Sequence, residues 1–570
     1  MRPAAWLSGG RRERAALLWE AAVTLGRDQL RREWAGSAPH RWLISRPKPH
    51  GLAAAPTDLR PGRPSWGHAL LDGRFVFDGL VLETGPGGDP WNRPAPSRAF
   101  AVALHGMDWL PDLLCAPGGA RAALSLALGW QAVFGQWNSF SWSGAALERR
   151  VFNLACAARP LVLQASPAET EALLDSLARQ ARHLLLAGGS DARSVERAAA
   201  AATAGCALAG PAGEGLLDRA LPDLERRLPQ AVLPDGGHAS RSAEIGKVLL
   251  FDLRTLDHAL EQRGRAAPDT LSRAIDRLAG ALPGLVLADG RLPALQGSEM
   301  GDPVRIAAAL AGGRQPAPAD LAMPRAGYHR LTADALQLLV DVGAPATGAW
   351  SVTACAQPLA IEVLADRARL ITASAWSPRA DGAQALRLTP AASTASVSDS
   401  SCGRPLTGRL ARRLGHRLQG ALRVVSVRRH DSEAASWLDL SHDGWAETFG
   451  LTHGRRLYLD RQADELRGED QLTPAGEGPA PPSRRPPSLV VRFQLHPDVK
   501  ASLALDQQSV LLQPKGGRGW WLRNDAPQVA IEPGVHLEDG RPRHASQVVM
   551  KRPLGPDRTA RIRWKLGLGS

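Results

Sequence analysis

The chain divides into two halves by the period of its apolar residues. From about residue 99 to residue 282, apolar side chains recur every three or four positions, which is the spacing of helices that bury one face. Glycine or proline separates many of these segments. We therefore predict successive antiparallel helices that form a bundle, a solenoid or a closed toroid, and periodicity alone does not choose among the three. The helical segments are 99–114, 120–134, 144–158, 166–187, 195–210 and, with less definite ends, 213–227, 240–263 and 268–282.

One helix start is marked by a local signal. Ser166, Pro167 and Glu169 form the pattern of a capping box with proline at the first helical position. Before the helical half, residues 1–60 combine a basic amphipathic helix with a proline-rich segment. "DGRFVFDGL", residues 72–80, predicts a short strand pair or the edge of a hairpin.

Beyond about Ala326 the pattern becomes that of β-strands. Short alternating or β-branched runs occur at 335–343, 358–374, 457–460, 488–497, 509–514 and 519–524, separated by Gly, Pro, Asn and Asp. "ADRA", residues 365–368, predicts a hairpin turn, and Thr473–Ser488 is a proline-rich loop. The predicted domains are an N-terminal extension at 1–95, a helical domain at 96–325 and an all-β domain at 326–570.

Charge leaves several partners open. The chain has 570 residues and a net charge of +13, and six of its 69 basic residues are Lys. An arginine-rich surface suits carboxylate, sulfate or phosphate groups, but a solvated surface explains it equally well. A nucleic-acid partner rests on charge alone, without a recognition motif, so we do not expect one.

Cysteine spacing and hydropathy restrict the class of protein further. The five cysteines lie far apart, which favours buried thiols over disulfides or a zinc site. No stretch approaches the length of a transmembrane helix, and the first residues do not resemble a signal peptide. These patterns allow a cytoplasmic protein or export by another route.

Several segments in the same order resemble the heparinase II/III-like proteins of proteobacteria. They include "APTDLRPGRPSWGHALLDGRFVFDG", "ALHGMDWLPDL", "PDGGHASRS", "GYHRL", "LLVDVGAP", "LSHDGWAETFGLTHGRRLYLD", "LRGEDQL", "VRFQLHPDV" and "WWLRNDAPQVAIEPGVHL". The resemblance covers about residues 50 to 565. It implies an N-terminal (α/α) toroid followed by a C-terminal antiparallel β-sandwich domain, which agrees with the two halves predicted from periodicity.

The resemblance also implies a chemistry, because many members are lyases of uronic-acid polymers. β-Elimination needs a group that neutralises the uronate carboxylate, a base for the C5 proton and an acid for the leaving oxygen. His238 matches the family's histidine in "PDGGHASRS", although a histidine that caps the following helix is an equal alternative. We expect His238 and His442 to be the acid and base, and Arg241 to bind the carboxylate.

Other positions depart from the family's pattern. Cys355 or a neighbour stands near a strand where active members carry a histidine, and Ala392 replaces the histidine of an "AHST"-like segment. The predicted helical domain has no tyrosine, since Tyr328 and Tyr458 are the only two in the chain. We expect an acidic polysaccharide as partner. The protein is then either a polysaccharide lyase with full, reduced or lost activity, or a non-catalytic glycan-binding or scaffold protein.

Aromatic and metal-binding candidates complete the expected site. Trp445 and Trp520 are predicted to stack on sugars, with packing in a core as the alternative, and Trp520 and Trp521 must point to opposite faces of a strand. We predict no cofactor. His442, Asp443 and His453 have ligand chemistry without diagnostic spacing, so a divalent metal in the β-domain stays open. By resemblance, the location is the cell envelope or periplasm.

Overall fold

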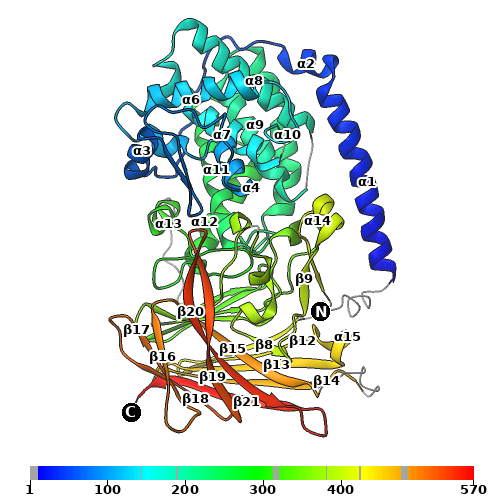
Figure 1. The fold of residues 1–570 in the computed structure, drawn as a ribbon, viewed down its shortest axis with the longest axis vertical. Coiled ribbons are helices and arrows are strands. Elements are labelled where there is room, and N and C mark those ends of the chain that lie inside the picture. The colour runs from blue at the N-terminus through cyan, green and yellow to red at the C-terminus, as the bar shows by residue number, and fades with distance from the viewer. Residues whose placement is uncertain are drawn as a thin grey trace.

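A helical domain is stacked on a β-domain in the computed structural model, which describes residues 11–569 apart from 143, 188–190, 312–319, 381, 421, 423–424 and 477–485 (Figure 1). The order of the elements confirms the predicted helical half followed by an antiparallel β half. The helices of the predicted helical region are α4 (Arg98–His105), α5 (Leu110–Leu114), α6 (Gly119–Phe134), α7 (Gly144–Val162), α8 (Pro167–Ala187), α9 (Ser194–Ala207), α10 (Pro211–Ala231), α11 (Ala243–Gln262), α12 (Asp269–Leu285) and α13 (Pro303–Leu310).

Helix α9 is the centre of the helical domain. It contacts α7, α8, α10 and α11, and all its residues except Arg197 are buried. Its run of alanines leaves room for the backbones of the surrounding helices to approach closely. The predicted capping box at α8 is confirmed, since Glu169 accepts a 2.8 Å bond from the Ser166 N–H, and Ser166 Oγ accepts one of 3.3 Å from the Glu169 N–H.

The N-terminal segment joins the same core. It comprises α1 (Arg11–Gly36), α2 (Ala38–Ser45), α3 (Pro64–Leu71) and the strands β1 (Arg74–Phe77) and β2 (Leu80–Glu83), which pair as predicted. Ile44, Phe75 and Trp91 are buried in the hydrophobic core of the helical domain. Only α1 lies apart, along the outside of the molecule (Figure 1). Large apolar side chains are exposed on α1 and α2: Leu18, Trp19, Leu25, Leu30, Trp34, Trp42 and Leu43.

The β-domain has an inner sheet of nine strands that lies between the helical domain and the outer sheet (Figure 1). Leu339 faces the core of the helical domain, whereas its neighbours Leu338 and Val340 face the core of the sandwich. Burial of both faces explains the nearly continuous apolar run of this strand. The strands are β3 (Leu321–Met323), β4 (Tyr328–Thr332), β5 (Leu336–Asp341), β6 (Ile361–Ala365), β7 (Ala368–Thr372), β8 (Ala395–Val397), β15 (Ser488–Leu495), β19 (Gln528–Glu538) and β20 (Arg541–Pro553).

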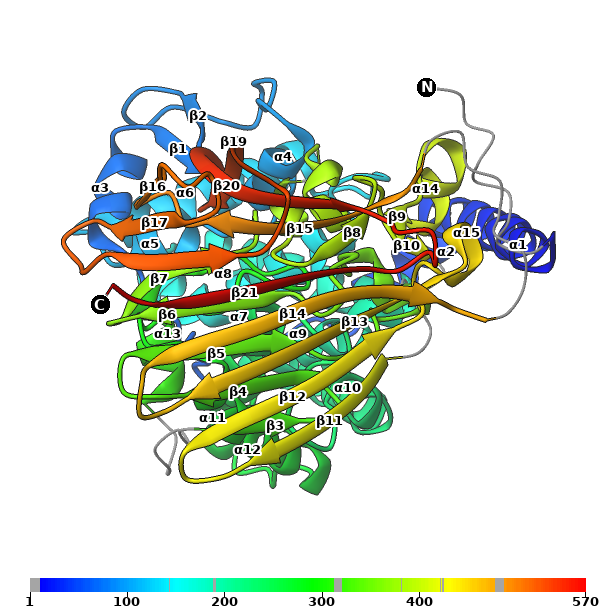
Figure 2. The same cartoon turned by 90° about the horizontal axis from the view of Figure 1, so that it is seen from below.

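The outer sheet has eight strands in the order β11-β12-β13-β14-β21-β18-β17-β16, and one of its faces is turned away from the helical domain (Figure 2). Alternate residues point into the sandwich, so Trp520 is buried and Trp521 lies on the opposite face, as predicted. The strands are β11 (Val425–Asp431), β12 (Ala435–His442), β13 (Leu451–Asp460), β14 (Glu465–Pro474), β16 (Val499–Leu503), β17 (Val510–Pro514), β18 (Trp520–Asn524) and β21 (Ala560–Leu568). Smaller elements are β9 (Gly403–Pro405), β10 (Leu418–Gly420), α14 (Gly408–Leu414) and α15 (Ala446–Phe449).

Two predicted details can be compared with the structure. The "ADRA" turn joins β6 to β7, with Asp366 and Arg367 both in the left-handed region. Much of the predicted loop at 473–488 lies outside the described residues. The predicted domain boundary at 325/326 falls between β3 and β4, which pair with each other. The edge strand β3 of the inner sheet therefore lies before this boundary, and the rest of the sheet lies after it.

The cysteines and the helices bear on the expected class of protein. Cys206, Cys355 and Cys402 are buried and Cys156 is partly buried, but Cys115 is exposed, so the prediction of buried thiols is wrong for Cys115. None of the helices in the described part of the chain has the length and apolarity that a membrane crossing requires.

Candidate functional site at the domain interface

Arg241 fastens the helical domain to the inner sheet. It lies just before α11 with φ +65°, and Ser242 caps that helix, which therefore begins three residues later than predicted. The Arg241 guanidinium donates hydrogen bonds to the carbonyls of Ala326 (2.8 Å), Gly327 (2.9 Å), Gly343 (2.9 Å) and Ala344 (3.1 Å). It also forms a buried ion pair with Asp341 in β5.

These contacts leave Arg241 no donor for a substrate. Burial lowers the pKa of Arg241, but the Asp341 carboxylate outweighs this effect and raises it, so the guanidinium stays charged. Gly327 and Gly343 are needed beside it, because a Cβ at either position would come within 3.0 Å of the guanidinium. The expected contact of Arg241 with a uronate carboxylate is therefore replaced by contacts between the two domains.

His238 is enclosed beside this junction. Its Nδ1 lies 2.7 Å from Ser240 Oγ and accepts a 3.1 Å bond from the Ser240 N–H, so the neutral ring carries its proton on Nε2. That Nε2 is buried, and none of the described residues offers it a hydrogen-bond partner. Burial, with a smaller contribution from Arg193, lowers the pKa of His238 to about 3. The ring packs edge-on against Trp350 at 5.2 Å. Of the two predicted alternatives, this environment fits a local structural role better than a catalytic one.

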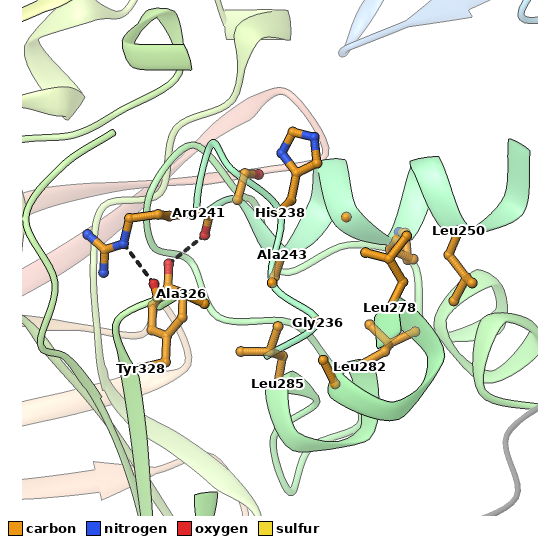
Figure 3. Close-up of a pocket in the computed structure, with 15 residues that line it drawn as sticks. Gly236, His238, Arg241, Ala243, Leu250, Leu278, Leu282, Leu285, Ala326 and Tyr328 are labelled. Carbon is orange, nitrogen blue, oxygen red and sulfur yellow. Dashed lines mark hydrogen bonds between the residues drawn. The ribbon is translucent and has the colours of Figure 1, made fainter. Parts of the chain in front are cut away.

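The pocket at His238 is too small for a sugar. Its volume is about 20 Å³, and its walls are largely the apolar side chains of α11 and α12 (Figure 3). A cavity of this size holds about one water molecule. Tyr328 lies on the opposite side and donates a 2.8 Å hydrogen bond to the Arg241 carbonyl, while burial raises its pKa far above the usual range. His442 does not line this pocket.

His442 belongs instead to a buried chain of hydrogen bonds inside the sandwich. Because the Gly444 N–H donates to His442 Nδ1 (3.1 Å), His442 Nε2 donates to His453 Nδ1 (3.0 Å). His453 Nε2 then donates to Asp470 Oδ1 (2.9 Å). Burial lowers the pKa of both histidines. Each imidazole is therefore neutral and fully paired at neutral pH, as expected of structural groups.

Asp470 and Arg455 complete this chain and join the two sheets. Asp470 also accepts hydrogen bonds from Arg455 Nε (2.7 Å), Arg455 Nη2 (3.1 Å) and Trp564 Nε1 (2.9 Å). Burial alone would raise the pKa of Asp470, but Arg455 and His453 hold it well below the usual range. Arg455 donates across to the carbonyls of Leu359 (2.8 Å) and Ser393 (3.1 Å) on the inner layer. The network is thus enclosed between the layers.

The remaining predicted residues are also buried. Trp445 and Trp520 have exposed fractions of 1% and 0%, and both belong to the sandwich core, so neither offers a ring face to a sugar. Ala392 and Cys355 are buried too, and burial raises the pKa of the Cys355 thiol to about 11. Within the described ranges, no three His, Cys, Asp or Glu side chains are placed to hold a metal ion.

Two arginines that sequence patterns did not identify remain partly accessible. The side chain of Arg193, which pairs with Glu148 of α7, is 41% exposed, and that of Arg379, which lies 3.4 Å from Glu244 of α11, is 55% exposed. Arg193 precedes α9 and acts electrostatically on His238. Neither arginine stands in a diagnostic motif, so only the fold reveals that they lie near the domain junction.

A helical toroid stacked on an antiparallel β-sandwich is also the fold of known proteins. Residues 315–565 match the family model "Heparinase II/III-like, C-terminal". The crystal structure of heparinase III superposes with a TM-score of 0.69 at 15% identity, covering 89% of this chain and 84% of that one. Heparan sulfate lyase HepC from Pedobacter heparinus gives 0.56 at 14% identity, covering 93% and 87%. At these identities the structures support the fold alone.

The chain belongs to the heparinase II/III-like family. It is 50% identical over 562 residues to FtsZ-localized protein C from Caulobacter vibrioides (strain NA1000 / CB15N), and the match covers 97% of both chains.

Proposed function

We propose that this chain uses the heparinase-type fold as a non-catalytic scaffold at assemblies of FtsZ. The observation that carries the proposal is the use of Arg241 as a tie between the domains, with five acceptors for its guanidinium. His238 and His442 are likewise buried and neutral. A lyase site needs these groups open to substrate, whereas a scaffold needs them only to hold the fold.

The relative supports the location. Half of all residues are shared with a protein described as FtsZ-localized, over nearly the full length of both chains. A scaffold of this kind would act on the cytoplasmic side of the division site, rather than in the periplasm that the lyases suggested.

Two measurements test the scaffold. A fluorescent fusion should form a band with labelled FtsZ in dividing cells, and the purified chain should sediment with FtsZ polymers. The same preparation should give no unsaturated-uronate absorbance with a panel of uronic-acid polymers. Diffuse fluorescence together with no co-sedimentation, or steady product formation, would overturn the proposal.

A second candidate is β-elimination on an acidic polysaccharide of the cell envelope. It is favoured by the Nε2 of His238, which has no partner among the described residues, and by Arg193, whose side chain is partly exposed and whose charge lowers the pKa of that imidazole. Here His238 keeps its expected role in proton transfer and Arg193 takes the carboxylate in place of Arg241, whereas His442 stays in its hydrogen-bonded chain inside the sandwich. This second function predicts that the chain forms an unsaturated-uronate product and that Arg193→Ala abolishes its formation. Arg226 is an exposed arginine of α10, so Arg226→Ala should leave product formation unchanged.

A further inference from the structure

The outer face of the eight-stranded sheet carries an open groove of about 620 Å³ across β12, β13, β14, β21 and β18. This face is turned away from the helical domain (Figure 2). Most of the residues that line it belong to two neighbouring rows of directly paired residues. One row, here called the cationic row, is Trp437, Tyr458, Arg467, Lys565 and Arg523.

The second row of the groove neutralises its own charges. Asp439, Arg456, Glu469 and Arg563 follow one another across four strands with alternating sign. Arg456 lies 3.6 Å from both carboxylates, and Arg563 lies 3.1 Å from Glu469. Opposite charges at paired positions are the arrangement that stabilises a sheet.

The cationic row breaks this pattern. Arg467, Lys565 and Arg523 are consecutive cross-strand neighbours of like charge, an arrangement that destabilises a sheet. One flanking carboxylate, Glu465, pairs with both Arg467 and Lys565. Arg523 lies over the Trp521 ring at 5.9 Å. Two of the three cations therefore share one carboxylate, which leaves the row with an excess of positive charge.

The other end of the cationic row is aromatic. Trp437 is 49% exposed and meets Tyr458 edge-on at 5.8 Å, and Arg467 lies over the Tyr458 ring at 5.6 Å. A large exposed tryptophan beside a line of cations is the composition of a binding hot spot. The row thus offers an apolar contact at one end and anion contacts along the rest.

The donors of this row favour carboxylates over sugar hydroxyls. Arg and Lys side chains only donate hydrogen bonds, which matches a carboxylate that only accepts. A sugar hydroxyl also needs acceptors, but Glu465 and Glu469 are already paired with cations. The side-chain oxygen of Asn524 likewise already accepts a 2.9 Å hydrogen bond from the Ala526 N–H.

We propose that the cationic row is the docking site for an acidic peptide segment of a protein partner, with an apolar side chain of that segment against Trp437. The proposal rests on the proposed scaffold function, for which it supplies the contact face. The segment crosses the strands, so that successive carboxylates meet Arg467, Lys565 and Arg523.

Fluorescence anisotropy on the intact chain tests the site, with a labelled peptide of glutamates around one leucine as the probe. Arg523→Glu and Trp437→Ala should each weaken binding about tenfold or more. The matched controls on the helical elements, Arg226→Glu and Trp19→Ala, should change it less than twofold, and added salt should weaken binding of the unmodified chain. Thermal midpoints decide whether a loss is only unfolding, since removing one like-charged neighbour should leave the midpoint unchanged or raise it.

The outcomes separate the docking site from the scaffold function. No binding of the peptide, equal losses in the control variants, or tighter binding of a uronate oligosaccharide of equal charge would overturn the docking site. If Arg523→Glu still sediments with FtsZ polymers as the unmodified chain does, the site is wrong and the scaffold function stands. If the peptide binds at this row but the unmodified chain neither sediments nor localises with FtsZ, the scaffold function is wrong.

Discussion

Arg241 before α11 and Asp341 in β5 form a buried ion pair across 100 residues of sequence and between two domains. The pair matters for function, because it occupies the arginine that a uronate carboxylate would need. Gln296 donates a 2.6 Å hydrogen bond to the other oxygen of Asp341, so both partners are fully engaged.

Replacing Arg241 by alanine should destabilise the chain by about 3–5 kcal/mol, because Asp341 is left buried without a counter-charge. Arg241→Lys should recover little of the lost stability, because a single ammonium group cannot contact all the acceptors that the planar guanidinium contacts at once. Urea unfolding followed by tryptophan fluorescence measures the loss. Arg226→Ala, whose ion pair is exposed, is the control and should cost less than about 1 kcal/mol. Full stability of Arg241→Ala would show that the contacts between the domains lie elsewhere.

Stability should fall as the pH drops from about 6.5 towards 4. Burial lowers the pKa of His238 to about 3 and that of His105, His183, His329, His496 and His536 to about 4. In this pH window the histidines are therefore protonated in the unfolded chain but not in the folded chain. Each histidine lowers the free energy of unfolding by about 1.4 kcal/mol per pH unit as the pH falls. Above about 6.5 this contribution is fully present.

Urea midpoints between pH 8 and 4 measure this dependence. His238→Asn should reduce the slope by about one proton in the window. A flat profile would mean that the buried imidazoles gain solvent or partners on protonation.

Asp470→Asn should cost about 3–5 kcal/mol, because Arg455 would lose its counter-charge inside the sandwich. Asp439→Asn, a partly exposed carboxylate on the outer face of the same sheet, should change stability by less than about 1 kcal/mol. Thermal unfolding monitored by circular dichroism compares them. A stable Asp470→Asn variant that loses a measurable uronate-lyase activity would instead favour a catalytic chain through His442 and His453.

Local patterns predicted much of the fold, because they depend on near neighbours. The capping box at Ser166, the turn at Asp366 and the opposite faces of Trp520 and Trp521 each follow from residues a few positions apart. The β-strand at Leu336–Asp341 was predicted as well. Its place between two cores was not, because nothing in its sequence tells which layers cover it.

The candidate site was less predictable, because its contacts are distant and involve the backbone. Arg241 bonds to four carbonyls that lie 85 to 103 positions away, and a carbonyl acceptor leaves no signal in residue identity. Family resemblance identified His238 and His442 by position alone. It could not show that one imidazole closes a turn and the other joins Asp470 in the sandwich.

Removing residues 1–34 should leave both domains nearly as stable as before. Among the residues of α1 whose side chains are described, only Ala35 is buried. Glu20 of α1 forms an ion pair with Arg417, and this pair is partly exposed. Exposed contacts of this kind are worth at most about 1 kcal/mol each. The shortened chain should therefore unfold within a few degrees of the full chain in a calorimetric scan, and its peptide binding at Trp437 should not change. A much larger drop would show that α1 contributes to the domain cores, and the exposed Leu18, Trp19 and Leu30 would then need a packing partner.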